Sequence, residues 1–171
     1  TDVSVRTSSC SGLTFDNLDV SKPAGAQGGT GINISSSSGA MTVKNCKVSN
    51  RRTGLYCDGN ANWTVIDNDL RTSGFNSNEP ALYFTSVSSG TIAASNNLFG
   101  GTGANVALRL HNCSNKVIGD VNATPAAANI LINDADGLLD LSGTDVSIYA
   151  TNCSNLTFDN LDVSKPAGVQ G

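Results

Sequence analysis

The sequence is poor in charge, in aromatic side chains and in long apolar runs, and each shortage excludes a class of protein. Only 14% of its 171 residues are charged, 5% are aromatic, and His111 is the single histidine. No run reaches the roughly 18 apolar residues of a membrane span, and no window carries apolar residues at helical spacing over three turns. With a net charge of −4 and no basic stripe, the chain is not expected to bind nucleic acid. Short strands joined by turns are therefore expected.

A duplicated segment is the strongest feature that the sequence does have. Residues 1–28 return as residues 144–171, with 21 of 28 positions identical and a constant offset of 143. Repeats at a fixed period are typical of solenoids and tandem arrays. We therefore interpret residues 1–171 as a single β-solenoid, in which residues 1–143 form one tandem unit and residues 144–171 start a second.

A shorter period runs inside the long one. Segments related to Leu13-Thr14-Phe15-Asp16-Asn17 begin at residues 13, 41, 63, 90, 116, 139 and 156, so six coils of about 24 residues make one unit. Upstream of each lies a pair of apolar residues separated by one position, which predicts a strand with one buried face. The pairs are Val3/Val5, Ile32/Ile34, Leu55/Cys57, Leu82/Phe84, Leu108/Leu110, Ile130/Ile132 and Val146/Ile148.

This succession of strand, turn, strand and Asn/Asp corner resembles the right-handed parallel β-helix of the pectin-lyase-like superfamily, and within it the short repeats of bacterial and archaeal surface proteins. The resemblance implies an all-β, right-handed, single-stranded β-helix whose coils stack about 4.8 Å apart. One buried ladder is then expected at Phe15, Val43, Val65, Ile92, Ile118, Leu141 and Phe158.

A corner ladder is expected where each second strand ends, because Asn and Asp tolerate left-handed backbone angles and stacked amides can bond between coils. Its members are Asn17, Asn45, Asp67, Asp120 and Asn160.

The five cysteines predict small buried side chains rather than a redox or metal site, because no cluster has the spacing of metal ligands. Cys113 and Cys153 lie two coils apart on this pattern, or about 10 Å, which is beyond the reach of a disulfide. We expect no intrachain disulfide and no metal site.

Catalytic candidates are few. Alternation turns Arg109 and His111 outward, and one coil later Asp134 could approach them, while Asp134 and Asp136 could bind calcium. The acid pairs and calcium-arginine sites that the resemblance implies for polysaccharide lyases and hydrolases have no residue-by-residue match here. We expect a solvated turn at 133–137, no cofactor and no enzymatic activity, with a lyase or hydrolase as the alternative.

The outward position between the paired apolar residues predicts an interaction stripe of Tyr56, Tyr83 and Arg109, with Tyr149 close to its end. The full row reads Ser4, Asn33, Tyr56, Tyr83, Arg109, Leu131 and Ser147. Such a stripe suits sugar stacking or side-by-side packing of rods. Burial of the stripe beneath the long loops is an equally open interpretation.

Two further surface features are expected. An outward threonine row, at Thr14, Thr42, Thr64, Thr91 and Thr157, would suit an ice-binding or carbohydrate-binding module, although Thr also simply favours strand surfaces. Of six N-x-S/T triplets, Asn62 and Asn155 are the better glycosylation candidates, because they are expected at turns just before strands.

The ends of the chain shape the functional hypothesis. No signal peptide is visible, so we expect an excerpt or a mature product. The first residues are expected to form a strand and the last a loop, with no capping segment at either end. Strand edges would then be left unpaired at the ends of the solenoid and could pair with another chain. The hypothesis is a non-enzymatic structural or adhesive component of an extracellular filament or cell-surface array. It would self-associate end to end or laterally, with polysaccharide as a further partner.

Overall fold

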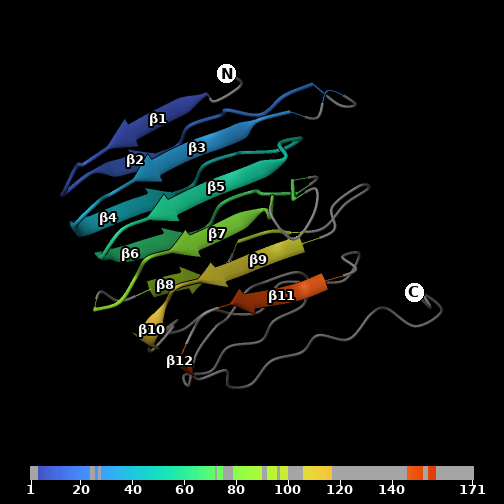
Figure 1. Cartoon of the computed structure of the whole chain (residues 1–171). Helices are drawn as coiled ribbons and strands as arrows, with labels where there is room; N and C mark the ends of the chain where they lie inside the picture. The colour runs from blue at the N-terminus through green and yellow to red at the C-terminus, as the bar shows by residue number, and fades with distance from the viewer. Residues whose placement is uncertain are drawn as a thin grey trace.

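The fold is a parallel β-solenoid. The computed structural model describes residues 4–23, 26, 28–71, 73–74, 79–89, 92–95, 97–99, 106–116, 146–151 and 154–156. Within these ranges the regular elements are twelve strands without a helix, and every strand pairing is parallel (Figure 1). The expected all-β solenoid is confirmed, whereas its right-handed winding and the count of six coils per unit stay predictions.

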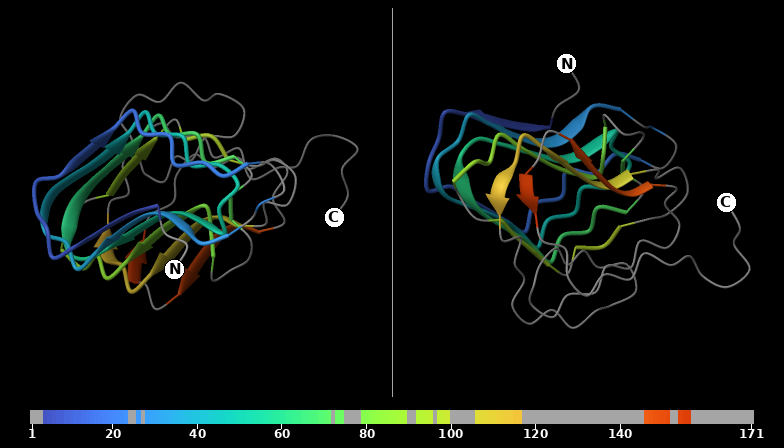
Figure 2. Two further views of the ribbon diagram at one scale, coloured as in Figure 1. Left: turned by 90° about the horizontal axis from the view of Figure 1, so that it is seen from above. Right: turned by 60° about the horizontal axis from the view of Figure 1, so that its bottom comes forward.

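Odd-numbered and even-numbered strands form different sheets. A six-stranded sheet contains, in order, β1 (Val5–Ser8), β3 (Thr30–Ser35), β5 (Thr53–Asp58), β7 (Leu82–Thr85), β9 (Val106–His111) and β11 (Val146–Thr151). A four-stranded sheet contains β2 (Thr14–Asp16), β4 (Gly39–Lys44), β6 (Ala61–Ile66) and β8 (Ile92–Ser95), and a third sheet pairs β10 (Ser114–Lys116) with β12 (Ser154–Leu156). The chain therefore alternates between sheets as it winds, and the strands enclose one interior (Figure 2).

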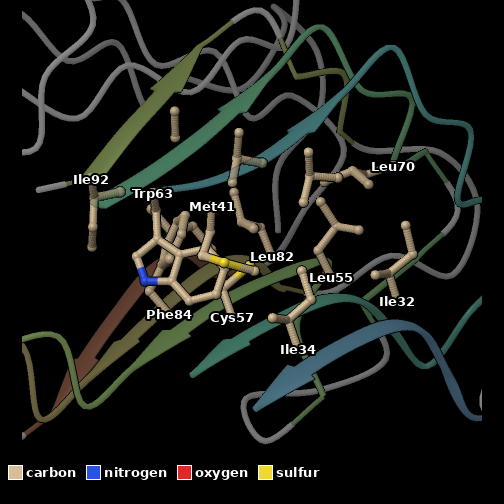
Figure 3. Close-up of a cluster of buried hydrophobic side chains, with 14 of the residues drawn as sticks. Ile32, Ile34, Met41, Leu55, Cys57, Trp63, Leu70, Leu82, Phe84 and Ile92 are labelled. Atoms are coloured by element: carbon tan, nitrogen blue, oxygen red, sulfur yellow. The ribbon is translucent and has the colours of Figure 1, made fainter. Parts of the chain in front are cut away.

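The core lies between the sheets and is built from ladders of apolar side chains. One ladder consists of Ile32, Leu55, Leu82 and Leu108, all fully buried. Trp63 of β6 and Phe84 of β7 meet edge to face with ring centroids 6.2 Å apart, which joins the two sheets (Figure 3). Each such side chain contributes about 1.5–3 kcal/mol by leaving water.

The buried ladder predicted along the second strands has the correct register in three coils, although Phe15 is only partly buried, and it is shifted in the fourth. Phe15, Val43 and Val65 are in register, but Ala94 lies opposite Val65, and Ile92 pairs with Trp63. A shift of two residues keeps the same side chains facing inward, so alternation alone does not distinguish the two registers. In the observed register Ile92 and Ala94 are both buried. An alignment that places Gly90 opposite Trp63 would not bury both.

The first strand of each duplicated segment shows the same two-residue shift. Val5 pairs with Ile32, where Val3 was expected, and Ile148 pairs with Leu108, where Val146 was expected. Both copies of the segment therefore enter the six-stranded sheet in the same way.

The order of strands near the second copy differs from the prediction. β11 pairs directly with β9, so the expectation that a strand at 130–132 lies between them is wrong; residues 130–132 themselves lie outside the described part. The backbones of Ile148 and Leu108 are in register. A parallel ladder requires only that two strands alternate in the same way, so the repeat pattern does not specify which strand is the neighbour.

This order also changes the axial separation expected between Cys113 and Cys153. Ser114 pairs with Ser154, so their coils are adjacent, and the expected two-coil separation of Cys113 and Cys153 is wrong. Cys10, Cys46, Cys57 and Cys113 are free thiols, whereas Cys153 lies outside the described residues.

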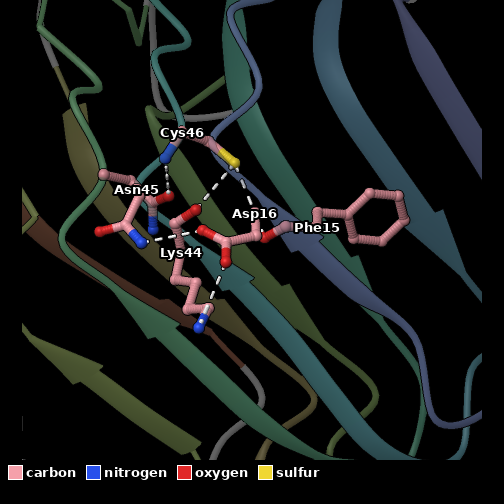
Figure 4. A network of polar contacts seen from close by, with 6 residues as sticks. Phe15, Asp16, Lys44, Asn45 and Cys46 are labelled. Carbon is pink, nitrogen blue, oxygen red and sulfur yellow. Dashed lines mark hydrogen bonds and ion pairs between the residues drawn. The ribbon is translucent and has the colours of Figure 1, made fainter.

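Left-handed backbone angles mark the corners. Asn17, Asn45 and Asp67 have φ values of 56°, 54° and 58°, as predicted for the corner ladder, whereas Asp120 and Asn160 lie outside the described residues. The expected amide-to-amide bonds are replaced here by a mixed network: the Asn45 amide donates to Asp16 Oδ1 at 2.8 Å, and Lys44 Nζ lies 3.3 Å from Asp16 Oδ2 (Figure 4). The hydrogen bond from Asn45 is the main cause of the lowered pKa of Asp16.

A second left-handed corner follows the strands of the six-stranded sheet and was not predicted. Its residues share φ values of 52–60°, and they are Ser9, Ser36, Ser86 and Asn112. The signal was weak because serine occurs throughout this chain and rarely marks a left-handed turn by itself.

Stacked amides do occur, one residue further along and inside the solenoid. Asn68 and Asn97 are fully buried, and Asn68 Nδ2 donates to Asn97 Oδ1 at 2.8 Å. Asn68 Nδ2 also donates to the Val43 carbonyl, and Asn97 Nδ2 donates to the Val65 carbonyl. Asn68 Oδ1 in turn accepts from the backbone N–H of Cys46. This internal amide ladder satisfies backbone groups at a corner that the strands leave unpaired.

Candidate functional site

The candidate site is the outer face of the six-stranded sheet, which Figure 1 shows face-on. One row of register positions crosses all six strands, and we call it the outer stripe: Arg6, Asn33, Tyr56, Tyr83, Arg109 and Tyr149. From β3 to β9 the row points outward, because the residues on either side of it, such as Leu55 and Cys57, or Leu82 and Phe84, are fully buried.

The structure revises the membership of the stripe at its ends. Tyr56, Tyr83 and Arg109 stand in consecutive positions, as predicted, and the backbone of Tyr149 pairs directly with Arg109. Arg6 occupies the register position expected for Ser4, and Tyr149 that expected for Ser147. Allowing a two-residue slip in the duplicated segment would have found both. Leu131 lies outside the described residues.

The side chains of the central stripe contact one another from coil to coil. The rings of Tyr56 and Tyr83 have centroids 5.1 Å apart at an interplanar angle of 90°, an edge-to-face arrangement. The guanidinium carbon of Arg109 lies 4.8 Å from the centroid of the Tyr83 ring, a cation–π contact. Because parallel strands lie about 4.8 Å apart, side chains at equivalent positions of neighbouring coils are close enough for such contacts.

Partial burial sets the electrostatics of the stripe. Tyr56 and Tyr83 are half-buried. Desolvation raises the pKa of Tyr56, with a further contribution from the negative charge of Asp58. Desolvation also raises the pKa of Tyr83, against the opposing effect of Arg109. Both phenols therefore stay protonated near neutral pH and can donate a hydrogen bond to a partner.

A second outward row runs beside the stripe, two residues further along each strand. Asp58, Thr85 and His111 are in register, and Ser8 pairs with Ser35. The carboxylate of Asp58 accepts a hydrogen bond from the backbone N–H of Ser36 at 2.9 Å. The two rows together place aromatic, cationic, anionic and hydroxyl residues on one side of the sheet, where Thr85 is buried and Asp58 and His111 are half-buried.

The catalytic and metal candidates are only partly placed. Arg109 and His111 both lie on the outer side of β9, half-buried, as alternation predicted. Asp134 and Asp136, the calcium candidates, lie outside the described residues. Within the described part, no group of three His, Cys, Asp or Glu residues could hold a metal ion.

The other surface candidates fall in strands. Asn62 is the exposed second residue of β6, and Asn155 is the middle residue of β12, so neither stands in the turn before its strand as expected. Thr14, Thr42 and Thr64 are in register on the outer side of the four-stranded sheet, but Ala93 takes the place expected for Thr91, and residue 157 lies outside the described part.

The chain matches no protein-family model, no curated protein and no solved structure. A search of the described residues finds no helix with the length and apolar character of a membrane span. The functional argument therefore depends on the stripe and on the repeat themselves.

Proposed function

We propose that this protein is a structural or adhesive module of an extracellular filament or cell-surface array, in which one β-solenoid continues through tandem units. One observation carries the proposal: β1 and β11 belong to the two copies of the 28-residue segment, and both are strands of the same six-stranded sheet. The second copy thus joins the ladder that the first copy began. Further units added in the same way would lengthen the rod, because each coil of a solenoid contacts only its neighbours.

The outer surface is suited to contacts along the sides of the rod. Its rows alternate small hydroxyl side chains with a few paired charges, such as Asp16 with Lys44 and Asp69 with Arg71. The coil pattern that resembles the pectin-lyase-like superfamily supports right-handed winding and membership of that group.

A second candidate function is the binding or cleavage of a polysaccharide. The observation that favours it is the placement of His111, Arg109 and Tyr83 side by side on the outer face, since acid/base groups next to an aromatic ring suit a sugar substrate. Turnover of polygalacturonate, with and without calcium, tests this candidate; activity abolished by His111→Ala would establish it.

Electron microscopy of the concentrated protein tests the filament proposal. We expect elongated rods and a fibre-diffraction reflection at about 4.8 Å along the rod axis, the spacing of stacked strands. Compact particles that do not lengthen at any concentration would contradict the proposal, most strongly if the same particles turn over a polysaccharide.

A further inference from the structure

We propose that the outer stripe is the contact between two copies of this chain, packed face to face with their solenoid axes antiparallel. This lateral pairing does not depend on the extension of the solenoid by further units. It follows from the order of side chains along the stripe, which is complementary to its own reverse.

A two-fold axis lying between the two sheets and parallel to their strands defines the arrangement. Rotation about it reverses the order of the coils and keeps each outward row opposite itself. In a stripe of six register positions, the first then faces the sixth, the second faces the fifth and the third faces the fourth. Each contact occurs twice, as in any isologous interface.

The facing positions are chemically matched. Tyr56 meets Tyr83 of the second copy, an aromatic pair at the centre of the contact, where binding energy concentrates. Arg6, which is exposed, faces the register position of Tyr149.

Asn33 faces Arg109 of the second copy and supplies an independent reason for a partner. Its Oδ1 atom is buried and has no hydrogen-bond partner among the described residues. An unsatisfied buried acceptor costs about 1–3 kcal/mol. The side chain as a whole is half-buried, so a rotation of its amide presents the oxygen to an incoming guanidinium, which donates up to five hydrogen bonds.

The second outward row is also compatible with the reversed order. Asp58 faces the position of Thr85, whose side chain is buried, and Ser35 faces His111, so that no two like charges meet. Pairing with the coils in the same order, about a two-fold axis that runs along the stripe, would instead set Arg6 and Arg109 each against its own copy. Like charges placed opposite each other cost several kcal/mol, so the antiparallel order is favoured.

The geometry favours a second copy over a sugar as the occupant. A sugar stacks on an open ring face, but the Tyr83 ring already carries the Arg109 guanidinium on one face and meets Tyr56 edge to face. The remaining edges and hydroxyls suit another protein surface, where tyrosine and arginine are the residues most enriched.

The pair is expected to be weak for a single chain. Six strands span only about 24 Å along the axis, so the contact is smaller than the roughly 800 Å² per partner of a stable interface. Association should therefore be measured up to millimolar concentration, and tandem units would raise the avidity.

Directional cross-linking tests the orientation. Ser35→Cys and His111→Cys leave the stripe intact. Facing sheets pack about 10 Å apart, so a bifunctional maleimide that bridges this distance, added to an equal mixture, should give cross-linked pairs that join position 35 to position 111. Ser88→Cys, at an exposed position in the turn after β7, and the unaltered chain measure the background from native thiols. Pairs that join position 35 to position 35 would overturn the antiparallel order.

Sedimentation equilibrium tests the stripe itself. We expect Tyr83→Ala and Arg109→Glu to weaken association at least tenfold, and Tyr83→Phe to retain most of it, with thermal melting confirming that each variant folds. A chain that stays monomeric up to millimolar concentration would overturn the proposal. So would a monomer that is retarded by a soluble polysaccharide in affinity electrophoresis and loses this retardation on Tyr83→Ala, which would assign the stripe to a glycan.

Discussion

The inside and the outside of the same strands obey different rules. Along β5 and β7, the inward residues Leu55, Cys57, Leu82 and Phe84 are fully buried, whereas the outward residues Tyr56 and Tyr83 remain half-exposed. The inward rows must fill a closed space, so their size is fixed by their neighbours. The outward rows must only avoid conflict between coils. Stability therefore resides mainly in the inward rows, and recognition can change on the outward rows at little cost to the fold.

The largest expected effect comes from filling a close backbone approach with Gly54→Ala. A Cβ atom at this buried glycine would lie 2.4 Å from the carbonyl oxygen of Ala81. That oxygen accepts the hydrogen bond of Leu55 N–H at 2.8 Å, so it cannot move aside without breaking the ladder. We expect a loss of about 3 kcal/mol or more, measured by urea unfolding.

Gly12→Ala is the matched control for this prediction, because no atom lies within 4 Å of its added Cβ. It should cost only about 1 kcal/mol, from its positive φ of 67°. Equal losses in the two variants would contradict the steric explanation.

The next effect is expected at the internal amide ladder. Asn68→Leu keeps the branching of the side chain, with a larger volume, but removes the partners of the Val43 carbonyl and the Cys46 N–H, both buried. We expect a loss of about 2–4 kcal/mol in thermal or urea unfolding. Asn62→Leu, at an exposed position of β6, should change stability by less than about 1 kcal/mol. If Asn68→Leu were neutral, the ladder would be dispensable for the fold.

A smaller effect is expected at the outer stripe. Tyr83→Ala removes the edge-to-face contact with Tyr56 and the cation–π contact with Arg109, together about 1–2 kcal/mol. Thr42→Ala, on the outer row of the four-stranded sheet, should cost about 0.5 kcal/mol. If Tyr83→Ala destabilised the chain as much as Asn68→Leu does, stability would not reside mainly in the inward residues.

The smallest effect is a pH dependence at a surface ion pair. Hydrogen bonds from Arg71 are the main cause of the lowered pKa of Asp69, and the two side chains approach to 2.8 Å. A lowered pKa means that this stabilisation is complete above the ordinary aspartate value of about 3.9 and is lost as pH falls through the lower folded value. The contribution is about 0.5 kcal/mol or less because Arg71 is exposed.

Urea unfolding of the unaltered chain and of Asp69→Asn, between pH 7 and pH 2, would detect the contribution of this ion pair. The free energy of unfolding should change with pH at slightly different slopes in the two chains. Identical pH profiles for the two chains would show that the ion pair contributes nothing to stability.

Much of the fold could be predicted because period-two alternation and the Asn/Asp corners are local signals. They correctly indicated the strand pairs at Ile32/Ile34 and Leu55/Cys57, and the left-handed angles at Asn45 and Asp67. Register was harder, because a slip of two residues leaves every side chain on its own face. For this reason the coil alignment predicts Val65 as the partner of Ile92, whereas Ile92 pairs with Trp63.

The candidate site was predictable at its centre and not at its ends. Tyr56, Tyr83 and Arg109 follow from simple alignment of the coils, but Arg6 enters the stripe only through the shifted register of β1. The buried role of Asn68 could not be predicted, because an asparagine next to an aspartate at a corner reads as a solvated turn. Only tertiary packing determines that this amide points inward.

The direction of the hydrogen bonds has a mechanical consequence. In both large sheets the ladders connect one coil to the next, and the amides of Asn68 and Asn97 add a connection of the same kind inside the rod. Tension along the axis would therefore load all the hydrogen bonds between two coils at the same time. These bonds would have to break together, whereas the bonds of a hairpin pulled from one end break one after another. Such a rod would resist stretching and would break abruptly between coils.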